Sequence, residues 1–256
     1  MLSEQINHFT KENLDTYLKE LAKEYRKLSG KAMLAEIILV GGAAILAGYG
    51  FRDMTTDIDA VIHASSFMKD AINHVGDRFA LPNGWLNTDF IRTASYSQKL
   101  SQYSSHYRTY SGVLSVRIIG AEYLIAMKLR SGRQYKNDMS DIVGILAEHD
   151  KRENPIALEQ IKAAVVNLYG DWSVIPDVSR TFIEDVVKNG DYSAVYSKTV
   201  ENEKNSKATL IRFEENYPGV TTQDNVNDIL RTLKQKQKND AAERLGLSET
   251  ETAQEE

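Results

Sequence analysis

The stretch Val40-Gly41-Gly42-Ala43, followed after thirteen residues by Asp57-Ile58-Asp59, decides the fold of this chain. The apolar run Ile37–Val40 just before the glycines predicts a short, fully buried strand. Small apolar residues over 43–47 predict a helix packed closely behind that strand. Apolar and polar residues alternate over 57–63, which predicts a second strand. The pattern is therefore strand, Gly-Gly turn, helix, loop and acidic strand.

The two aspartates of this stretch have the spacing of a metal site. Residues two apart on a strand project from the same face, with Cα atoms about 6.5–7 Å apart. Asp57 and Asp59 can therefore reach one cation, or two neighbouring cations, while Ile58 packs into the core. Mg²⁺ prefers such oxygen ligands and completes its shell with water and substrate phosphates. We expect Mg²⁺ here, with Mn²⁺ as the alternative ion.

Gly41 and Gly42 lack side chains at the point where a strand turns into a helix. A triphosphate can approach the backbone N–H groups there and the positive end of the helix dipole. Taken alone, a Gly-Gly pair is more often a simple turn, and an Asp-X-Asp is usually a polar strand edge. An EF-hand is excluded because the downstream glycine and bidentate glutamate are missing. The two motifs together predict metal-dependent transfer of a nucleotidyl group from an NTP.

Further elements follow from periodicity and capping residues. Residues 11–29 predict an amphipathic helix with Thr10 as N-cap and Gly30 as C-cap. A helix to about residue 79 would be capped by Ser65 or Ser66. Residues 113–119 predict a further strand. Helices are expected over 123–129, 138–148 and 156–169, with Pro155 in the first turn of the last.

The glycine and aspartate motif resembles that of the DNA polymerase β-like nucleotidyltransferase superfamily. Three segments, Ala121–Leu129, Gly132-Arg133 and Lys136–Ile142, are similar to its bacterial AbiEii-type and DUF6036-type branch. The resemblance covers about residues 30–150. It implies an α+β fold, with a small mixed sheet flanked by helices and a C-terminal helical region. It also implies a setting in abortive infection or a toxin–antitoxin pair, with a cognate antitoxin as partner.

The segments that carry this resemblance contain a lysine and two aspartates that we expect to take part in nucleotide binding or in supporting the metal. Lys128 lies on a helix whose apolar residues face inward, so its charge can reach the triphosphate. Asp138 and Asp141 lie three apart at the start of the next helix and could orient Lys128 or Arg133, or support the metal. The alternative is that both carboxylates merely stabilise the helix N-terminus and form surface ion pairs.

The sequence departs from the superfamily at the third carboxylate, which usually comes from a later strand. The predicted strand 113–119 offers Ser115 and Arg117 instead of an acid. Asp89 is a possible substitute, and Asp138 is another. Without a third acid the site would hold one metal, act slowly, or bind a nucleotide without turnover.

A basic and aromatic stretch lies between residues 92 and 110. Tyrosines interleaved with positive charge can stack bases and contact phosphates of an RNA acceptor. We favour the alternative of a solvated hairpin whose tyrosines cover the sheet edge. The residues concerned are Arg92, Tyr96, Lys99, Tyr103, His106, Tyr107, Arg108 and Tyr110.

Composition sets broader bounds. The 256 residues are 42% hydrophobic and 26% charged, as in globular proteins, and the net charge of −5 does not favour a dedicated DNA-binding module. The chain has no cysteine, no readable secretory signal and no apolar run of membrane-spanning length, so we expect a cytoplasmic protein without membrane contact. The expected domains are a nucleotidyltransferase-like domain over 1–150, a helical region over 151–235 and a flexible polar tail over 236–256.

The leading hypothesis is a Mg²⁺-dependent nucleotidyltransferase acting on a hydroxyl of RNA or tRNA, a protein or a small molecule. The expected catalytic residues are Asp57, Asp59, Lys128 and Asp141, of which Asp57 and Asp59 bind the metal. The expected nucleotide-binding residues are Gly41, Gly42, Ala43, Thr56 and Arg133. The alternative is a non-catalytic nucleotide-binding or regulatory protein that keeps the fold.

Overall fold

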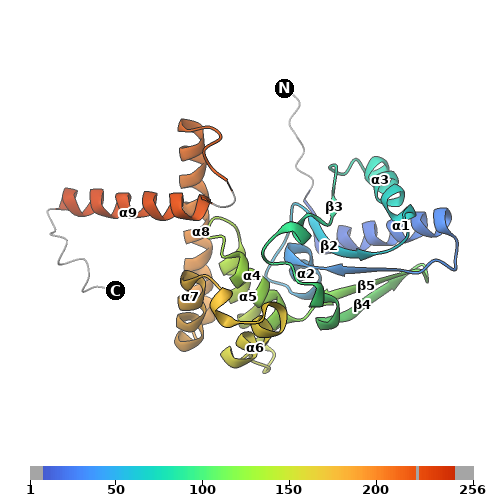
Figure 1. Cartoon of the computed structure of the whole chain (residues 1–256), viewed down its shortest axis with the longest axis horizontal. Coiled ribbons are helices and arrows are strands. Elements are labelled where there is room, and N and C mark those ends of the chain that lie inside the picture. The colour runs from blue at the N-terminus through green and yellow to red at the C-terminus, as the bar shows by residue number, and fades with distance from the viewer. Residues whose placement is uncertain (1–7, 223–224, 246–256) are drawn as a thin grey trace. The chain divides into compact units, whose positions relative to one another are not determined.

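The computed structural model of the chain describes residues 8–222 and 225–245 (Figure 1). The chain folds into two compact units. The first unit contains the described residues up to Gly132 together with Asp141–Val195, and the second contains Arg133–Ser140 together with the described residues from Tyr196 onward. Both units are discontinuous in sequence, and the expected domains over 1–150, 151–235 and 236–256 stay a prediction.

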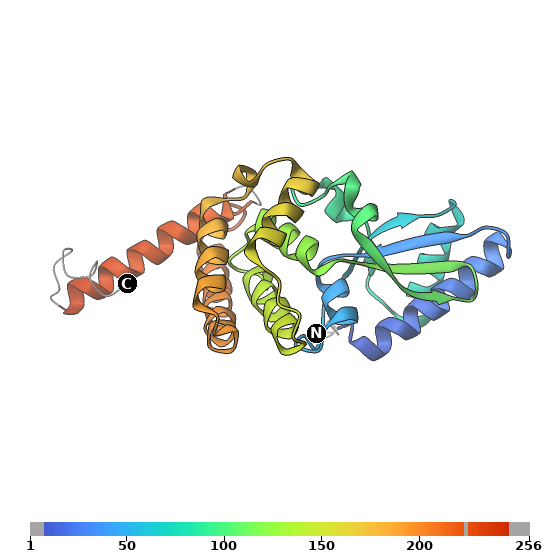
Figure 2. The same ribbon diagram turned by 90° about the horizontal axis from the view of Figure 1, so that it is seen from below.

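The first unit is built on a five-stranded mixed sheet, which confirms the α+β prediction (Figures 1 and 2). Its strand order is β3-β2-β1-β5-β4. The central strand β1 is antiparallel to β2 and parallel to β5, with Leu39 opposite Ala60 on one side and Ile118 on the other. The strands are β1 (Ala35–Leu39), β2 (Ile58–His63), β3 (Leu86–Asn87), β4 (Ser104–Tyr110) and β5 (Leu114–Ile119).

Helix α1 (Lys11–Ser29) begins and ends as its sequence predicts. Thr10 and Asn13 form a reciprocal capping box, and the N–H of Gly30 donates to the carbonyl of Arg26 at the other end. Leu14, Leu18 and Leu21 are buried on the apolar face of this helix. The helix packs against α3 (Phe67–Phe79) and β4. Ser66 is the N-cap residue of α3, but its side chain makes no capping hydrogen bond. The position of the predicted cap is therefore right, and the predicted capping by its side chain is wrong.

The remaining helices of the first unit follow the sheet. Helix α2 (Gly41–Gly48) is buried from Ala43 to Ala47. Helix α4 (Ala121–Ser131) packs against α6 (Leu158–Tyr169) and α7 (Asp177–Asn189). Helix α6 begins three residues after Pro155, so this proline lies before the helix rather than in its first turn. Helix α5 (Asp138–Lys151) supplies its first three residues to the second unit and the others to the first.

The second unit contains most of α8 (Tyr192–Asn216) and all of α9 (Val226–Leu245). Its small apolar cluster consists of Leu210, Val226 and Leu230, with Tyr135 and Ile229 packed against it. Helix α9 includes residues 236–245 of the expected polar tail, and residues 246–256 lie outside the described residues. In the part of the chain that the structure describes, no helix has the length and apolar character needed to cross a membrane.

Candidate functional site

The glycine turn lies against the second of the two aspartates. Strand β1 ends at Leu39, and α2 begins at Gly41, whose φ of +56° is a conformation that favours glycine. A Cβ atom on Gly41 would lie 3.4 Å from Oδ2 of Asp59. The N–H of Val40 also donates to the carbonyl of Asp59 over 3.0 Å. The start of α2 and the start of β2 therefore meet at one point of the sheet.

Gly42 is required for a second close approach. A Cβ atom there would lie 2.5 Å from Oγ1 of Thr55 and 3.1 Å from a guanidinium nitrogen of Arg52. Thr55 is itself fixed, because its backbone pairs with Phe9 through hydrogen bonds of 2.8 and 2.9 Å. The loop that leads into the aspartates is therefore packed directly on the glycine turn.

Asp57 and Asp59 flank a buried anchor. Ile58 is fully buried, whereas Asp57 is exposed and Asp59 is half-buried. Strand β2 begins at Ile58, so Asp57 lies just before it, where its Oδ1 accepts a long hydrogen bond of 3.5 Å from Oγ1 of Thr55. Two carboxylates beside the glycine turn form a donor set that suits Mg²⁺ when phosphate and water supply the other ligands.

A third acid does not join this pair. Among residues 8–222 and 225–245, no group of three or more Asp, Glu or His side chains is arranged to hold a metal ion. Asp89 lies in a short 3₁₀ helix (Asp89–Arg92) that follows β3, with its N–H bonded to Oδ1 of Asn87. On β5, Arg117 instead donates to the side chain and carbonyl of Ser104. Within the described residues, Asp57 and Asp59 are therefore candidate metal ligands without a third acid beside them.

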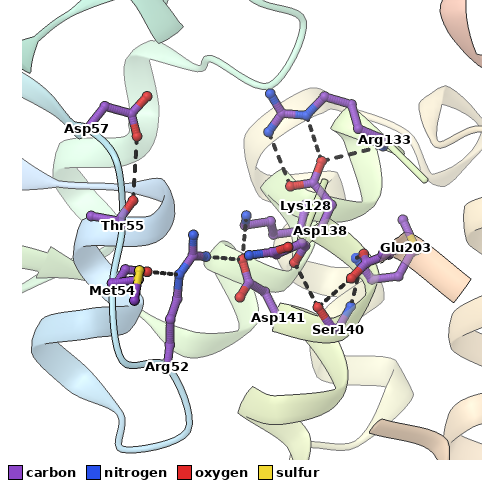
Figure 3. A network of polar contacts seen from close by, with 12 residues as sticks. Arg52, Met54, Thr55, Asp57, Lys128, Arg133, Asp138, Ser140, Asp141 and Glu203 are labelled. Atoms are coloured by element: carbon purple, nitrogen blue, oxygen red, sulfur yellow. Dashed lines mark hydrogen bonds and ion pairs between the residues drawn. The ribbon is translucent and has the colours of Figure 1, made fainter. Parts of the chain in front are cut away.

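Asp141 is the centre of a buried ionic cluster. Its Oδ2 lies 2.7 Å from Nη1 of Arg52 and 2.7 Å from Nζ of Lys128 (Figure 3). The side chains are only 3%, 17% and 10% exposed for Asp141, Arg52 and Lys128. Asp141 therefore contacts the lysine that the sequence suggested, and two cations converge on one carboxylate oxygen in a site of reduced dielectric.

Arg52 is the member of this cluster that the sequence did not reveal. Its Nε donates to the carbonyl of Met54 over 3.0 Å (Figure 3). Its guanidinium lies beside Gly42. The neighbouring Phe51 packs on α5 where Gly144 leaves room, since a Cβ atom on Gly144 would lie 2.4 Å from the Phe51 ring. Gly144 is one helical turn from Asp141, so this contact and the Arg52 ion pair fix the same loop on the same helix.

The other predicted nucleotide-binding residues lie in different surroundings. Ala43 is fully buried, whereas Thr56 is exposed next to Asp57, and a role of either in nucleotide binding stays a prediction. Arg133 and Asp138 belong to the second unit and bind each other through two nitrogen–oxygen contacts of 2.8 and 3.1 Å. A role of Arg133 in nucleotide binding stays a prediction.

Several side chains of the basic and aromatic stretch bind other residues of the first unit. Its second half is β4, the edge strand that forms a hairpin with β5. Tyr107, Arg108 and Tyr110 all bind Asp15 of α1. Lys99 donates to the carbonyl of Asn167, and Tyr103 stacks on Tyr123 with ring centroids 4.0 Å apart. These contacts agree with the hairpin interpretation that the sequence favoured.

A comparison with protein families supplies the class of the protein. Residues 16–150, more than half of the chain, match the family model described as nucleotidyltransferase of unknown function. The chain belongs to this family, DUF6036, which confirms that part of the resemblance noted from the sequence. No curated protein and no solved structure matches the chain.

Proposed function

We propose that this protein transfers a nucleotidyl group from an NTP to a hydroxyl acceptor, with Mg²⁺ held by Asp57 and Asp59. The observation that carries the proposal is the approach of Gly41 to Asp59, where a Cβ atom would lie 3.4 Å from the carboxylate. It brings the helix N-terminus, which favours phosphate, next to the carboxylates, which favour a divalent cation. Mn²⁺ would fit the same oxygen ligands.

Each residue has a role in this proposal. The backbone N–H groups of Gly41 and Gly42, at the start of α2, would face the triphosphate. Lys128 and Arg52 would attract its negative charge, and Asp141 would hold both cations in place. When bound, Mg²⁺ would neutralise the phosphate oxygens and stabilise charge at the α-phosphorus. The acceptor hydroxyl would belong to an RNA such as tRNA, a protein or a small molecule.

The experiment is a transfer assay with each labelled NTP, Mg²⁺ and either total RNA or cell lysate. We expect label transfer by the natural protein and none by the Asp57→Ala, Asp59→Ala double variant. Asp53→Ala is the matched control, because Asp53 is an exposed aspartate in the same loop. Thermal melting of all variants checks that they fold. Equal transfer by the double variant and the control would contradict the proposal.

A second candidate is a nucleotide-binding regulatory protein without turnover. The lack of a third acid beside Asp57 and Asp59 among the described residues favours it. Binding of an NTP without transfer to any acceptor in the same assay would support this candidate against the enzyme.

The resemblance to the AbiEii-type branch extends the proposal to a toxin held in check by an antitoxin in the cytoplasm. In this extension, expression of the natural chain arrests growth and expression of the double variant does not. Equal growth of both strains at equal protein levels would remove the toxin role while leaving the transfer assay to decide on catalysis.

A further inference from the structure

The first turn of α5 obtains its hydrogen-bond acceptor from a distant helix. Glu203 of α8 accepts hydrogen bonds from the N–H groups of Met139 and Ser140, over 2.8 and 3.3 Å (Figure 3). Its other carboxylate oxygen accepts from Oγ of Ser140 over 2.5 Å. Glu203 and Ser140 are both buried, so these bonds are shielded from water.

This contact acts in the manner of an N-cap. The first N–H groups of a helix have no partner within the helix, and an N-cap side chain normally accepts from the second or third of them. Helix α5 begins at Asp138, so Met139 and Ser140 are its second and third residues. A carboxylate at this end also interacts favourably with the helix dipole.

The face of α8 that carries Glu203 is unusual because its buried residues are mostly polar. Thr199, Glu203 and Ser206 are buried along with Leu210. Buried polar groups contribute less to stability than apolar packing does, but they specify one geometry, because each donor must meet its acceptor. The polar face of α8 is therefore suited to fixing the orientation of the turn that it contacts.

Asp141 follows Ser140 directly in the same helical turn, and its carboxylate pairs with Lys128 and Arg52. We infer that Glu203 is a positioning residue of the candidate site: by fixing the first turn of α5, it holds Asp141 where it binds Lys128. Glu203 lies outside residues 16–150, so the residue inferred to fix this turn comes from beyond the family match. The relevance of this positioning to nucleotide transfer rests on the proposed function.

The first readout is amide hydrogen exchange in the full-length protein. Because Met139 and Ser140 donate to Glu203 rather than to the helix, Glu203→Ala should make both amides exchange about tenfold faster or more. Glu201→Ala is the control, since Glu201 is an exposed glutamate on the same helix. Glu203→Gln keeps an acceptor oxygen, should restore part of the protection, and serves as the test if Glu203→Ala does not fold.

The second readout is the reactivity of Lys128 toward an amine-reactive ester, measured at each lysine by mass spectrometry. The side chain of Lys128 is only 10% exposed, so its labelling should be slow and should rise about tenfold in Glu203→Ala but not in Glu201→Ala. If transfer activity is present, the KM for the NTP should rise about tenfold in Glu203→Ala with a smaller change in kcat, and Glu203→Gln should lie between.

Two outcomes would overturn the inference. Unchanged exchange at Met139 and Ser140 in Glu203→Ala would show that the contact does not hold the turn. Faster exchange with unchanged Lys128 labelling would show that the turn does not position Asp141. Neither measurement requires turnover, so a protein that transfers no nucleotide would refute the proposed function and still decide the role of Glu203.

Discussion

Asp141 and Asp15 each bind several side chains, yet they serve regions of different character. The side chain of Asp141 is 3% exposed and meets two cations at one oxygen. The side chain of Asp15 is 29% exposed and binds one cation, Arg108, with the hydroxyls of Tyr107 and Tyr110. Burial and the convergence of cations separate a candidate site from a surface contact that joins α1 to β4.

The tyrosines around Asp15 support this distinction. Burial, followed by the negative charge and hydrogen bond of Asp15, raises the pKa of both Tyr107 and Tyr110. Both phenols therefore stay protonated in neutral solution and act as donors to Asp15. Tyr107, Arg108 and Tyr110 therefore have a structural task in joining β4 to α1.

The largest expected effect concerns Asp141. Asp141→Ala removes the carboxylate from a buried ion cluster and leaves Arg52 and Lys128 without it, so we expect a loss of about 3–5 kcal/mol in the free energy of unfolding. Urea denaturation measures it. Asp150→Ala, at the exposed end of the same helix, is the control. A loss no greater than that of the control would make Asp141 equivalent to a surface aspartate.

Gly42→Ala tests the close approach at the glycine turn. The added Cβ would collide with Oγ1 of Thr55, and overpacking of this kind costs about 1–3 kcal/mol. Gly50→Ala is the control, because no atom lies within 4 Å of a Cβ there. Adding Thr55→Ala to Gly42→Ala should recover part of the loss. Strictly additive effects in this double-mutant cycle would show that the two side chains do not compete for space.

Asp15→Ala should have a smaller effect. The carboxylate is partly exposed and its cation is half exposed, so we expect a loss of about 1 kcal/mol and unchanged nucleotide binding. Asp185→Ala on α7 is an exposed control. Chemical denaturation and NTP titration measure the two properties. Loss of NTP binding in Asp15→Ala but not in Asp185→Ala would contradict this expectation, because it would make the α1–β4 contact part of the nucleotide site.

The smallest expected effect is on stability, concerns Glu24, and appears only at low pH. Hydrogen bonds from His74 and then Arg78 lower the pKa of Glu24 on α1 below its ordinary value of 4.5. The unfolded chain therefore takes up this proton more readily, and the stability that Glu24 contributes is present above pH 4.5 and lost as the pH falls further. Glu24→Gln should flatten the stability profile below pH 4.5. The same loss of stability below pH 4.5 in both proteins would contradict this role.

Much of the first unit was predictable from local patterns. Helix α1, strands β1 and β2, and the intervening glycine helix follow from periodicity and capping residues, because these signals lie within a few residues of the structure they specify. The proximity of Gly41 and Asp59 also followed, since a strand, a turn and a returning strand leave few arrangements.

The partners of Asp141 show where sequence reasoning ends. Lys128 shares a recognisable segment with Asp141, but Arg52 lies 89 residues away and Glu203 follows Ser140 by 63 residues. No period or motif links such positions, because tertiary packing alone brings them together. The two-residue strand β3 was missed for a different reason, since it is too short to display alternation.

The pairing of β1 also has a consequence for biosynthesis. One edge of β1 is completed by β2, which follows it closely along the chain, whereas the other edge is completed by β5, about seventy-five residues later. When a ribosome extends the chain from its N-terminus, the N–H and C=O groups on this edge of β1 stay unpaired until residues 114–119 emerge. Closure of the sheet should therefore limit the folding rate, and chaperone binding during synthesis should centre on residues 35–40.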